Sequence, residues 1–310
     1  LRFNWGTSKE GEAGWSLILM ESFRKSQTGD ELGGSAEDNG YCEDRTQVQL
    51  GAALQRRFNE KWHADVNGSY YWLDYDNTRG DMDLYGWQRG ILGAEAGYAA
   101  SQWTDFLIAG NYQGYWQDNA EDSMRRVGTD ISDSSYGWTV QGGFGSYATK
   151  RITYRVLAGW SIFEYGDCGE SDNGFTYTVS GNWKIGETWN MMVLGSSYYQ
   201  PSERSYGSSS RVDAFSWGLA KSMIRGKLNA NLNITYRHDT NEQKYDGNRG
   251  DDFALDEITA RLSLNYYLNR YLSIFAAAEY IRCFNDEGDK MYDAYDYDRW
   301  RVTIGGRLSY

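Results

Sequence analysis

The last eleven residues of the sequence, from Trp300 to Tyr310, read WRVTIGGRLSY. Apolar residues and one glycine occupy every second position of this stretch, and mostly polar residues lie between them. Successive side chains of a β-strand point to opposite faces, so the pattern predicts a strand with one apolar face and one wet face. The question that this strand raises is which other strand pairs with it.

The same alternation recurs along the chain, for example in WHADVNGSYYW (62–72), GFTYTVSGNWK (174–184), KLNANLNITYR (227–237) and EITARLSLNY (257–266). No segment has a convincing amphipathic helical pattern. Each predicted strand is close to the length that crosses a bilayer at a tilt. We predict about 14 strands, at 15–26, 46–58, 62–74, 86–99, 103–117, 135–148, 152–165, 174–185, 188–199, 212–223, 227–238, 254–268, 271–284 and 299–310.

Composition excludes several classes of protein. Aromatic residues make up 16% of the 310 residues, which argues against disorder, and the net charge of −12 argues against a nucleic-acid partner. No apolar run approaches the roughly 20 residues that a membrane helix needs. The three cysteines, Cys42, Cys168 and Cys283, do not make a disulfide framework, although one pair of unspecified identity could form.

Connections between the predicted strands alternate in length. The short ones are 59–61, 101–102, 149–151, 186–187, 225–226 and 269–270, and the long ones are 27–45, 75–85, 118–134, 166–173, 200–211, 239–253 and 285–298. Aromatic residues flank many of the short turns, as Phe58 and Trp62 do. Rings of this kind settle at the headgroup level of a membrane. Short turns at one end and long loops at the other are the layout of an outer-membrane barrel.

This layout, over nearly the whole chain, resembles the bacterial outer-membrane β-barrels. WRVTIGGRLSY also resembles the C-terminal signal that the barrel-assembly machinery recognises. The resemblance implies an all-β, transmembrane, antiparallel up-and-down β-barrel of about 14 strands, or 16 if an N-terminal strand pair is included. Residues 1–13 would be a periplasmic entry segment or partial strand, and 14–310 a single barrel domain. We expect the last strand to pair with the first, because closure removes free edges. A soluble all-β protein such as a propeller is the alternative.

The polar face of the predicted strands would line the barrel lumen. Neutral amides and hydroxyls predominate there, and they match the hydroxyl groups of sugars. Among the inward aromatics, Tyr71, Tyr115, Tyr198 and Phe275 could stack on sugar rings. The predicted lumen-lining residues are Gln47, Gln49, Asn67, Tyr71, Arg89, Glu95, Asp105, Asn111, Gln113, Tyr115, Gln141, Arg155, Asn182, Tyr198, Asn229, Asn231, Asn233, Arg237, Glu257, Arg261, Glu279, Arg301 and Arg307.

Other motifs carry less information. The acidic long loops predict solvated segments, and no metal site or cofactor is expected. RGD occurs at 79–81 and 249–251, where chance produces it easily. His238 falls on the lipid face near the long loops, as in some outer-membrane lipases, but no serine stands where such motifs carry one. His63 lies near a short turn, at the opposite end of the predicted barrel from His238. With two histidines and neither partnered, we expect no enzyme and no catalytic residues.

We therefore expect an outer-membrane channel with a periplasmic C-terminus and extracellular acidic loops. The chain resembles the C-terminal barrel of exopolysaccharide export porins, which implies an export pore for a saccharide, with a periplasmic helical-repeat domain upstream as a partner. The alternatives are a general diffusion porin for small hydrophilic solutes and a surface adhesin or structural barrel. The expected partners are outer-membrane lipid and lipopolysaccharide, the barrel-assembly machinery and the saccharide, and no nucleic acid.

Overall fold

The computed structural model describes residues 2–6, 14–27, 44–76, 87–117, 134–146, 151–165, 171–201, 209–242, 244–245, 248–249, 253–285 and 297–308. Most of the residues outside these ranges belong to the long connections predicted from the sequence. The described residues contain no helix, and therefore no helix that is long and apolar enough to cross a membrane.

All of the regular structure is β-strand. Fourteen strands have 12 to 15 residues each, β1 has 5, and β13 and β14 have 2 each. The strands are β1 (Arg2–Gly6), β2 (Gly14–Gln27), β3 (Asp44–Arg57), β4 (Trp62–Asp76), β5 (Trp87–Ala99), β6 (Asp105–Gln117), β7 (Ser134–Ser146), β8 (Ile152–Tyr165), β9 (Ser171–Ile185), β10 (Trp189–Pro201), β11 (Ser209–Met223), β12 (Leu228–Glu242), β13 (Lys244–Tyr245), β14 (Asn248–Arg249), β15 (Phe253–Tyr267), β16 (Leu272–Asn285) and β17 (Tyr297–Leu308).

One antiparallel up-and-down sheet contains every long strand. Its order follows the chain from β1 to β12 and continues with β15, β16 and β17, while β13 and β14 form a separate hairpin. The predicted fold class and the fourteen long strands are confirmed. The short strand anticipated near the N-terminus is β1, which pairs with β2 from Arg2 opposite Met20 to Gly6 opposite Ser16.

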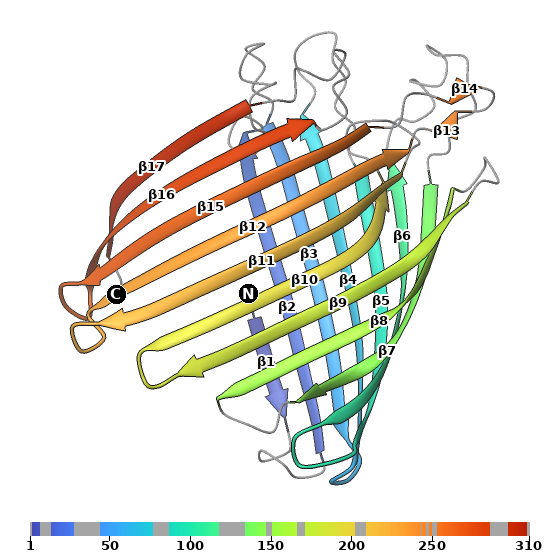
Figure 1. Ribbon diagram of the computed structural model, residues 1–310, viewed down its shortest axis with the longest axis horizontal. Helices are drawn as coiled ribbons and strands as arrows, with labels where there is room; N and C mark the ends of the chain where they lie inside the picture. The colour runs from blue at the N-terminus through green and yellow to red at the C-terminus, as the bar shows by residue number, and fades with distance from the viewer. Residues whose placement is uncertain are drawn as a thin grey trace.

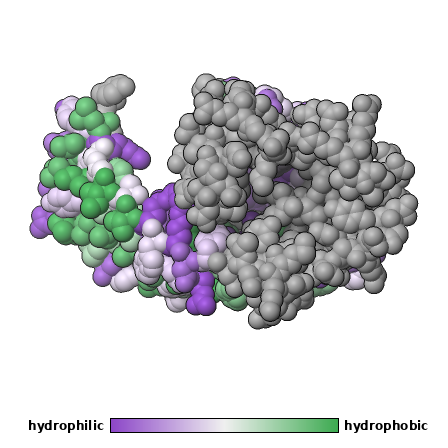
Figure 2. Space-filling model, turned by 90° about the horizontal axis from the view of Figure 1, so that it is seen from above, coloured by the Kyte–Doolittle hydropathy of each residue, from purple (hydrophilic) through white to green (hydrophobic). Residues whose placement is uncertain are grey.

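The sheet curves but does not close in the described part of the chain. Figure 1 shows β10, β11, β12 and β15 crossing in front of β2 to β5. In Figure 2, the coloured flank on the left, on the side of β17, continues into the rest of the described surface along its lower side. Strand β17 pairs with β16, and β1 pairs with β2. The described residues show no pairing between β17 and β1.

The expected pairing of the last strand with the first is therefore wrong for the described residues. The reason lies in the curvature of the sheet. It curls tightly through β5 to β9, but β11 to β17 splay outward at the end with the short turns (Figure 1). Within the described residues, this gentle curvature over half of the sheet leaves β1 and β17 apart.

Local interactions in the short turns explain why the chain reverses at these points. The Oδ1 atom of Asn59 accepts hydrogen bonds from the backbone N–H groups of Lys61 (2.8 Å) and Trp62 (2.9 Å). Asn269 holds the last short turn in the same way, through Tyr271 and Leu272. Asparagine side chains that bond their own backbone two residues on favour turns. We call this end of the sheet the short-turn end and the opposite end the long-loop end.

Candidate functional site on the inner face of the sheet

The strand register decides which residues share a face. Directly opposed residues of an antiparallel pair lie on the same face, and Gln49, Tyr71, Arg89 and Tyr115 oppose one another in sequence from β3 to β6. When the register is followed through all the pairs, every predicted lumen-lining residue falls on this face. We call it the inner face. The opposite face is the outer face and carries exposed apolar side chains such as Val302 and Ile304.

Part of the inner face is packed rather than open to water. Gln113, Tyr115 and Gln141 are 6%, 6% and 8% exposed, and the neighbouring Leu107 and Phe163 are at most 1% exposed. The amide of Gln141 donates to Thr176 and accepts from Thr178. These two glutamines, predicted to line the lumen, lie on the inner face but are packed there. Gln113 is bonded to Arg89 and to the backbone of Tyr199, and Gln141 to the two threonines, inside a folded-over part of the sheet.

Close backbone approach causes this packing. A Cβ atom on Gly159 would lie 1.9 Å from the Val140 carbonyl oxygen, and one on Gly143 would lie 2.0 Å from the Val156 carbonyl oxygen. Glycine permits β7 and β8 to approach to this distance. The tight curl also brings Arg155 of β8 onto Glu95 of β5, across the two intervening strands β6 and β7. Both members of this ion pair were predicted for the inner face.

An arc of aromatic rings follows the inner face near the long-loop end. The Tyr71 and Trp87 rings stack with centroids 4.6 Å apart, Trp87 lies 6.1 Å from Tyr115, and Tyr115 lies 6.2 Å from Phe163. The Arg89 guanidinium lies over the Tyr115 ring at 5.0 Å. Sequence reasoning missed Trp87 and Phe163. The alternation itself could have found Trp87, which stands two residues before Arg89 and so shares its face.

A second part of the inner face is an open groove of about 1010 Å³ over β10, β11, β12 and β15. Three predicted residues, Asn229, Asn231 and Asn233, line it from alternate positions of β12. More than half of the lining is apolar or charged, and it includes a fourth predicted residue, Arg261. Its remaining lining residues are Lys184, Gly186, Glu187, Thr188, Trp189, Asn190, Met192, Leu194, Ser216, Gly218, Ala220, Lys221, Ser222, Ala230 and Ser263.

Hydrogen bonds hold part of the groove in place. Ser216 donates to the Asn233 Oδ1 atom at 3.1 Å, the Asn233 Nδ2 atom donates to Thr235 at 3.3 Å, and Thr235 donates back to Ser216 at 3.2 Å. The Oδ1 atom of Asn190 is buried and has no hydrogen-bond partner among the described residues. A buried acceptor without a partner is stabilised when a water molecule or a solute donates a hydrogen bond to it.

Arginine residues gather beside the groove, toward β17. A cavity of about 250 Å³ is lined by Arg261, Arg307, Asn265 and Phe275, among others. Arg261 lies 3.8 Å from the Glu279 carboxylate, and Glu279 opposes Arg301 in the register. This wall of the sheet therefore offers cations as well as amides.

The four aromatics proposed to stack on sugars have different surroundings. Tyr115 is buried, so it cannot meet a solute, and that expectation is wrong. Tyr71 is half-buried against Trp87, and Tyr198 is half-buried on β10. Phe275 lines the arginine cavity and lies over Gly305, where a Cβ atom would be 2.6 Å from its ring.

The two histidines are better connected than the sequence suggested. His63 lies against Gly97 on the inner face. His238 lies on the outer face and contacts Asp256 and Thr240, so the expectation that it has no partner is wrong. Most of the acidic loop residues, both RGD motifs apart from Arg249, and two of the cysteines fall outside the described residues. Cys283 is buried beside Leu255 on the inner face.

Comparisons with known proteins show the fold. No family model matches, and no curated protein matches. Among solved structures, the FrpB iron transporter from Neisseria meningitidis (F3-3 variant) is 13% identical with a TM-score of 0.53, over 96% of this chain and 55% of that one. P. aeruginosa FpvA, bound to pyoverdine, is 10% identical with a TM-score of 0.50, over 96% and 50%.

The chain thus spans about half the length of the structures that it matches. These comparisons do not confirm the resemblance to export porins. The predicted architecture and the similar solved structures agree on one conclusion: the chain has the up-and-down strand fold of outer-membrane β-barrels.

Proposed function

We propose that this chain forms the wall of an outer-membrane channel that passes a hydrophilic solute, and that the Asn-lined groove of β10 to β15 is the part of the path that binds a saccharide. The observation that supports this most directly is the row of Asn229, Asn231 and Asn233 facing the groove. Amides donate and accept hydrogen bonds at once, as sugar hydroxyl groups do. The fold neighbours, one of them titled an iron transporter, support transport but do not support export of a polymer.

An anionic solute such as a ferric chelate is the second candidate. The observation that favours it is the arginine cavity of Arg261 and Arg307 beside the groove. Charge-assisted hydrogen bonds from guanidinium groups recognise carboxylates well. The two candidates differ in which wall residues hold the solute, and that difference can be measured.

Single-channel conductance of the purified chain in a planar bilayer tests both candidates. For the saccharide path, glucosamine oligomers should interrupt the current, and Asn231→Ala combined with Asn233→Ala should weaken that block about tenfold or more. For the anionic path, ferric citrate should block instead, and Arg261→Ala should relieve the block. Asn173→Ala is the matched control, because Asn173 lies on the outer face of β9 opposite Ile162.

Each result has a definite meaning. Block by the oligomers that both asparagine substitutions weaken supports the saccharide path. Block by ferric citrate alone rejects the saccharide path in favour of the anionic one. Absence of any current would reject a channel formed by this chain on its own.

A further inference from the structure

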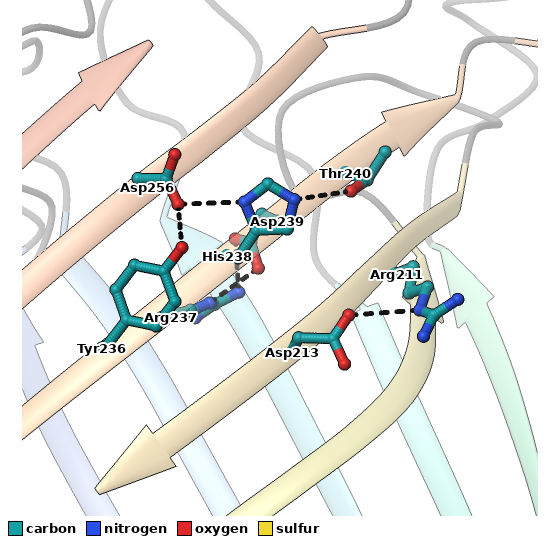
Figure 3. Close-up of polar contacts among 8 residues, drawn as sticks. All are labelled: Arg211, Asp213, Tyr236, Arg237, His238, Asp239, Thr240 and Asp256. Carbon is teal, nitrogen blue, oxygen red and sulfur yellow. Dashed lines mark hydrogen bonds and ion pairs between the residues drawn. The ribbon is translucent and has the colours of Figure 1, made fainter. Parts of the chain in front are cut away.

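A cluster of polar side chains interrupts the apolar outer face near the long-loop end of β11, β12 and β15. Figure 3 shows Asp256, His238 and Thr240 in a row, with the imidazole ring between the carboxylate and the hydroxyl group. The His238 Nδ1 atom lies 2.9 Å from the Asp256 Oδ1 atom, and the His238 Nε2 atom lies 3.2 Å from the Thr240 hydroxyl. His238 and Thr240 are two residues apart on β12, and Asp256 opposes His238 from β15.

For a neutral imidazole ring, these contacts favour one direction for each hydrogen bond. An ionised carboxylate only accepts, so the His238 Nδ1 atom carries the proton and donates it to Asp256. In the neutral ring the Nε2 atom is then an acceptor, and the Thr240 hydroxyl donates to it. A hydroxyl that donates to an imidazole, whose other nitrogen donates to a carboxylate, is the arrangement that activates an alcohol as a nucleophile.

Neighbouring residues hold the carboxylate in place and supply a further cation. The Tyr236 hydroxyl donates to the same Asp256 Oδ1 atom at 2.5 Å, and Asp256 is 5% exposed. Arg211 of β11 is directly opposite Thr240 in the register, and its Nε atom donates to Asp213 at 3.2 Å (Figure 3). Its guanidinium thus belongs to the same face as the hydroxyl.

The height of the cluster in the membrane suggests its substrate. Apolar residues occupy the outer face of β12 for eight steps, or about 27 Å along the strand and about 20 Å in height at a tilt near 40°. That is close to the roughly 25 Å apolar band of an outer-membrane barrel, and His238 is the next outward residue beyond it. In the orientation predicted from the sequence, with the long loops outside, the cluster would lie at the level of the acyl esters of outer-leaflet lipids. The apolar run is Leu228, Ala230, Leu232, Ile234 and Tyr236.

We propose that Thr240, His238 and Asp256 form a hydrolase site for acyl esters presented from the outer leaflet. The Thr240 oxygen forms a bond to the acyl carbonyl carbon while its proton passes to the His238 Nε2 atom. The carbon–oxygen bond to the alcohol then breaks, and the proton leaves with that alcohol. Water, deprotonated by His238 in the same way, cleaves the threonine ester to release the fatty acid. The net reaction consumes one ester and one water, and no oxidant is needed.

The roles of the residues differ. Thr240 is the nucleophile and His238 the base, while Asp256 and Tyr236 are positioning residues that act through the imidazole. Arg211 would stabilise the negative charge on the carbonyl oxygen. The site faces away from the groove, so it does not depend on the channel function.

Hydrolysis of p-nitrophenyl decanoate by the full chain in detergent micelles tests the proposal. We expect ester cleavage that Thr240→Ala and His238→Asn each lower about 100-fold, which is within the usual contribution of a general base. Thr240→Ser should keep or raise the rate, because a primary alcohol is less hindered. Asp256→Asn should lower the rate, and Asp256→Glu should restore part of it. Thr259→Ala, on the inner face of β15, is the control and should not change the rate.

A fluorophosphonate probe gives a second measurement that needs no variant. Mass spectrometry of the labelled wild-type chain should find the phosphonyl group on Thr240. Wild-type activity that is no higher than that of folded Thr240→Ala would overturn the proposal, and so would labelling only at other hydroxyl groups.

Discussion

The Nε2 atom of Gln113 on β6 donates a hydrogen bond to the backbone carbonyl oxygen of Tyr199 on β10, at 3.0 Å. Three strands, β7 to β9, separate the two residues in the sheet. The β9–β10 pairing ends at Thr178 opposite Ser196, so the last part of β10 leaves its neighbour and lies against the inner face of β6 and β8. There Tyr199 packs with Tyr115 and Phe163. This contact narrows the inner space at the long-loop end.

Gln113→Ala tests how much this contact contributes. The substitution removes the donor to Tyr199 and the acceptor of the Arg89 hydrogen bond (3.0 Å), and it leaves buried polar groups behind. We expect a loss of about 1–3 kcal/mol in the free energy of unfolding and a larger single-channel current. Denaturant titration in detergent measures the first effect. Gln88→Ala, at an exposed outer-face contact with Tyr70, should stay within about 0.5 kcal/mol.

Gly159→Ala tests whether the close approach of β7 and β8 needs glycine. A methyl group there would lie 1.9 Å from the Val140 carbonyl oxygen, so the two strands must separate. Forcing extra atoms into a packed site costs typically about 1–3 kcal/mol, and the backbone contact places this case at the upper end. Gly181→Ala is the control, because a Cβ atom at Gly181 meets nothing within 4 Å. Equal stability of the two variants would contradict the tight curl.

Glu95→Gln tests the ion pair between β5 and β8. The side chain of Glu95 is 10% exposed and that of Arg155 is 30% exposed, so removing one charge leaves the other poorly solvated. We expect a loss of about 1–3 kcal/mol, and partial recovery when Arg155→Met is added. Arg282 and Asp298 form a pair with side chains 58% and 61% exposed, and Asp298→Asn should cost about 1 kcal/mol or less. Thermal unfolding of all four proteins compares the two pairs.

Arginine at adjacent positions of β12 tests which face meets lipid. Leu232 lies on the outer face near mid-strand, and Asn231 lies on the inner face beside it. Leu232→Arg should destabilise folding into phospholipid vesicles by about 2–4 kcal/mol, while Asn231→Arg should cost little. A larger destabilisation by Asn231→Arg than by Leu232→Arg would mean that the assignment of the inner and outer faces is inverted.

The sequence by itself determined the strands, their faces and their order. Period-two alternation is a local property of the chain, so WRVTIGGRLSY and KLNANLNITYR predict both a strand and the face of each side chain without any contact partner. The alternating loop lengths added the up-and-down order. A local pattern could therefore place Asn231 and Arg261 on the same face, 30 residues apart.

Only the tertiary structure decided how the sheet curves and which strands meet beyond their neighbours. The last strand was predicted to pair with the first, at 15–26 (β2). In the described sheet, which curls through β7 and β8, β17 pairs with neither β2 nor β1. The contacts of Gln113 with Tyr199 and of Arg155 with Glu95 join strands that are not paired, and no periodicity encodes such contacts. The link from Asp256 to His238 depends on register as well. A shift of one residue would have put the two side chains on opposite faces.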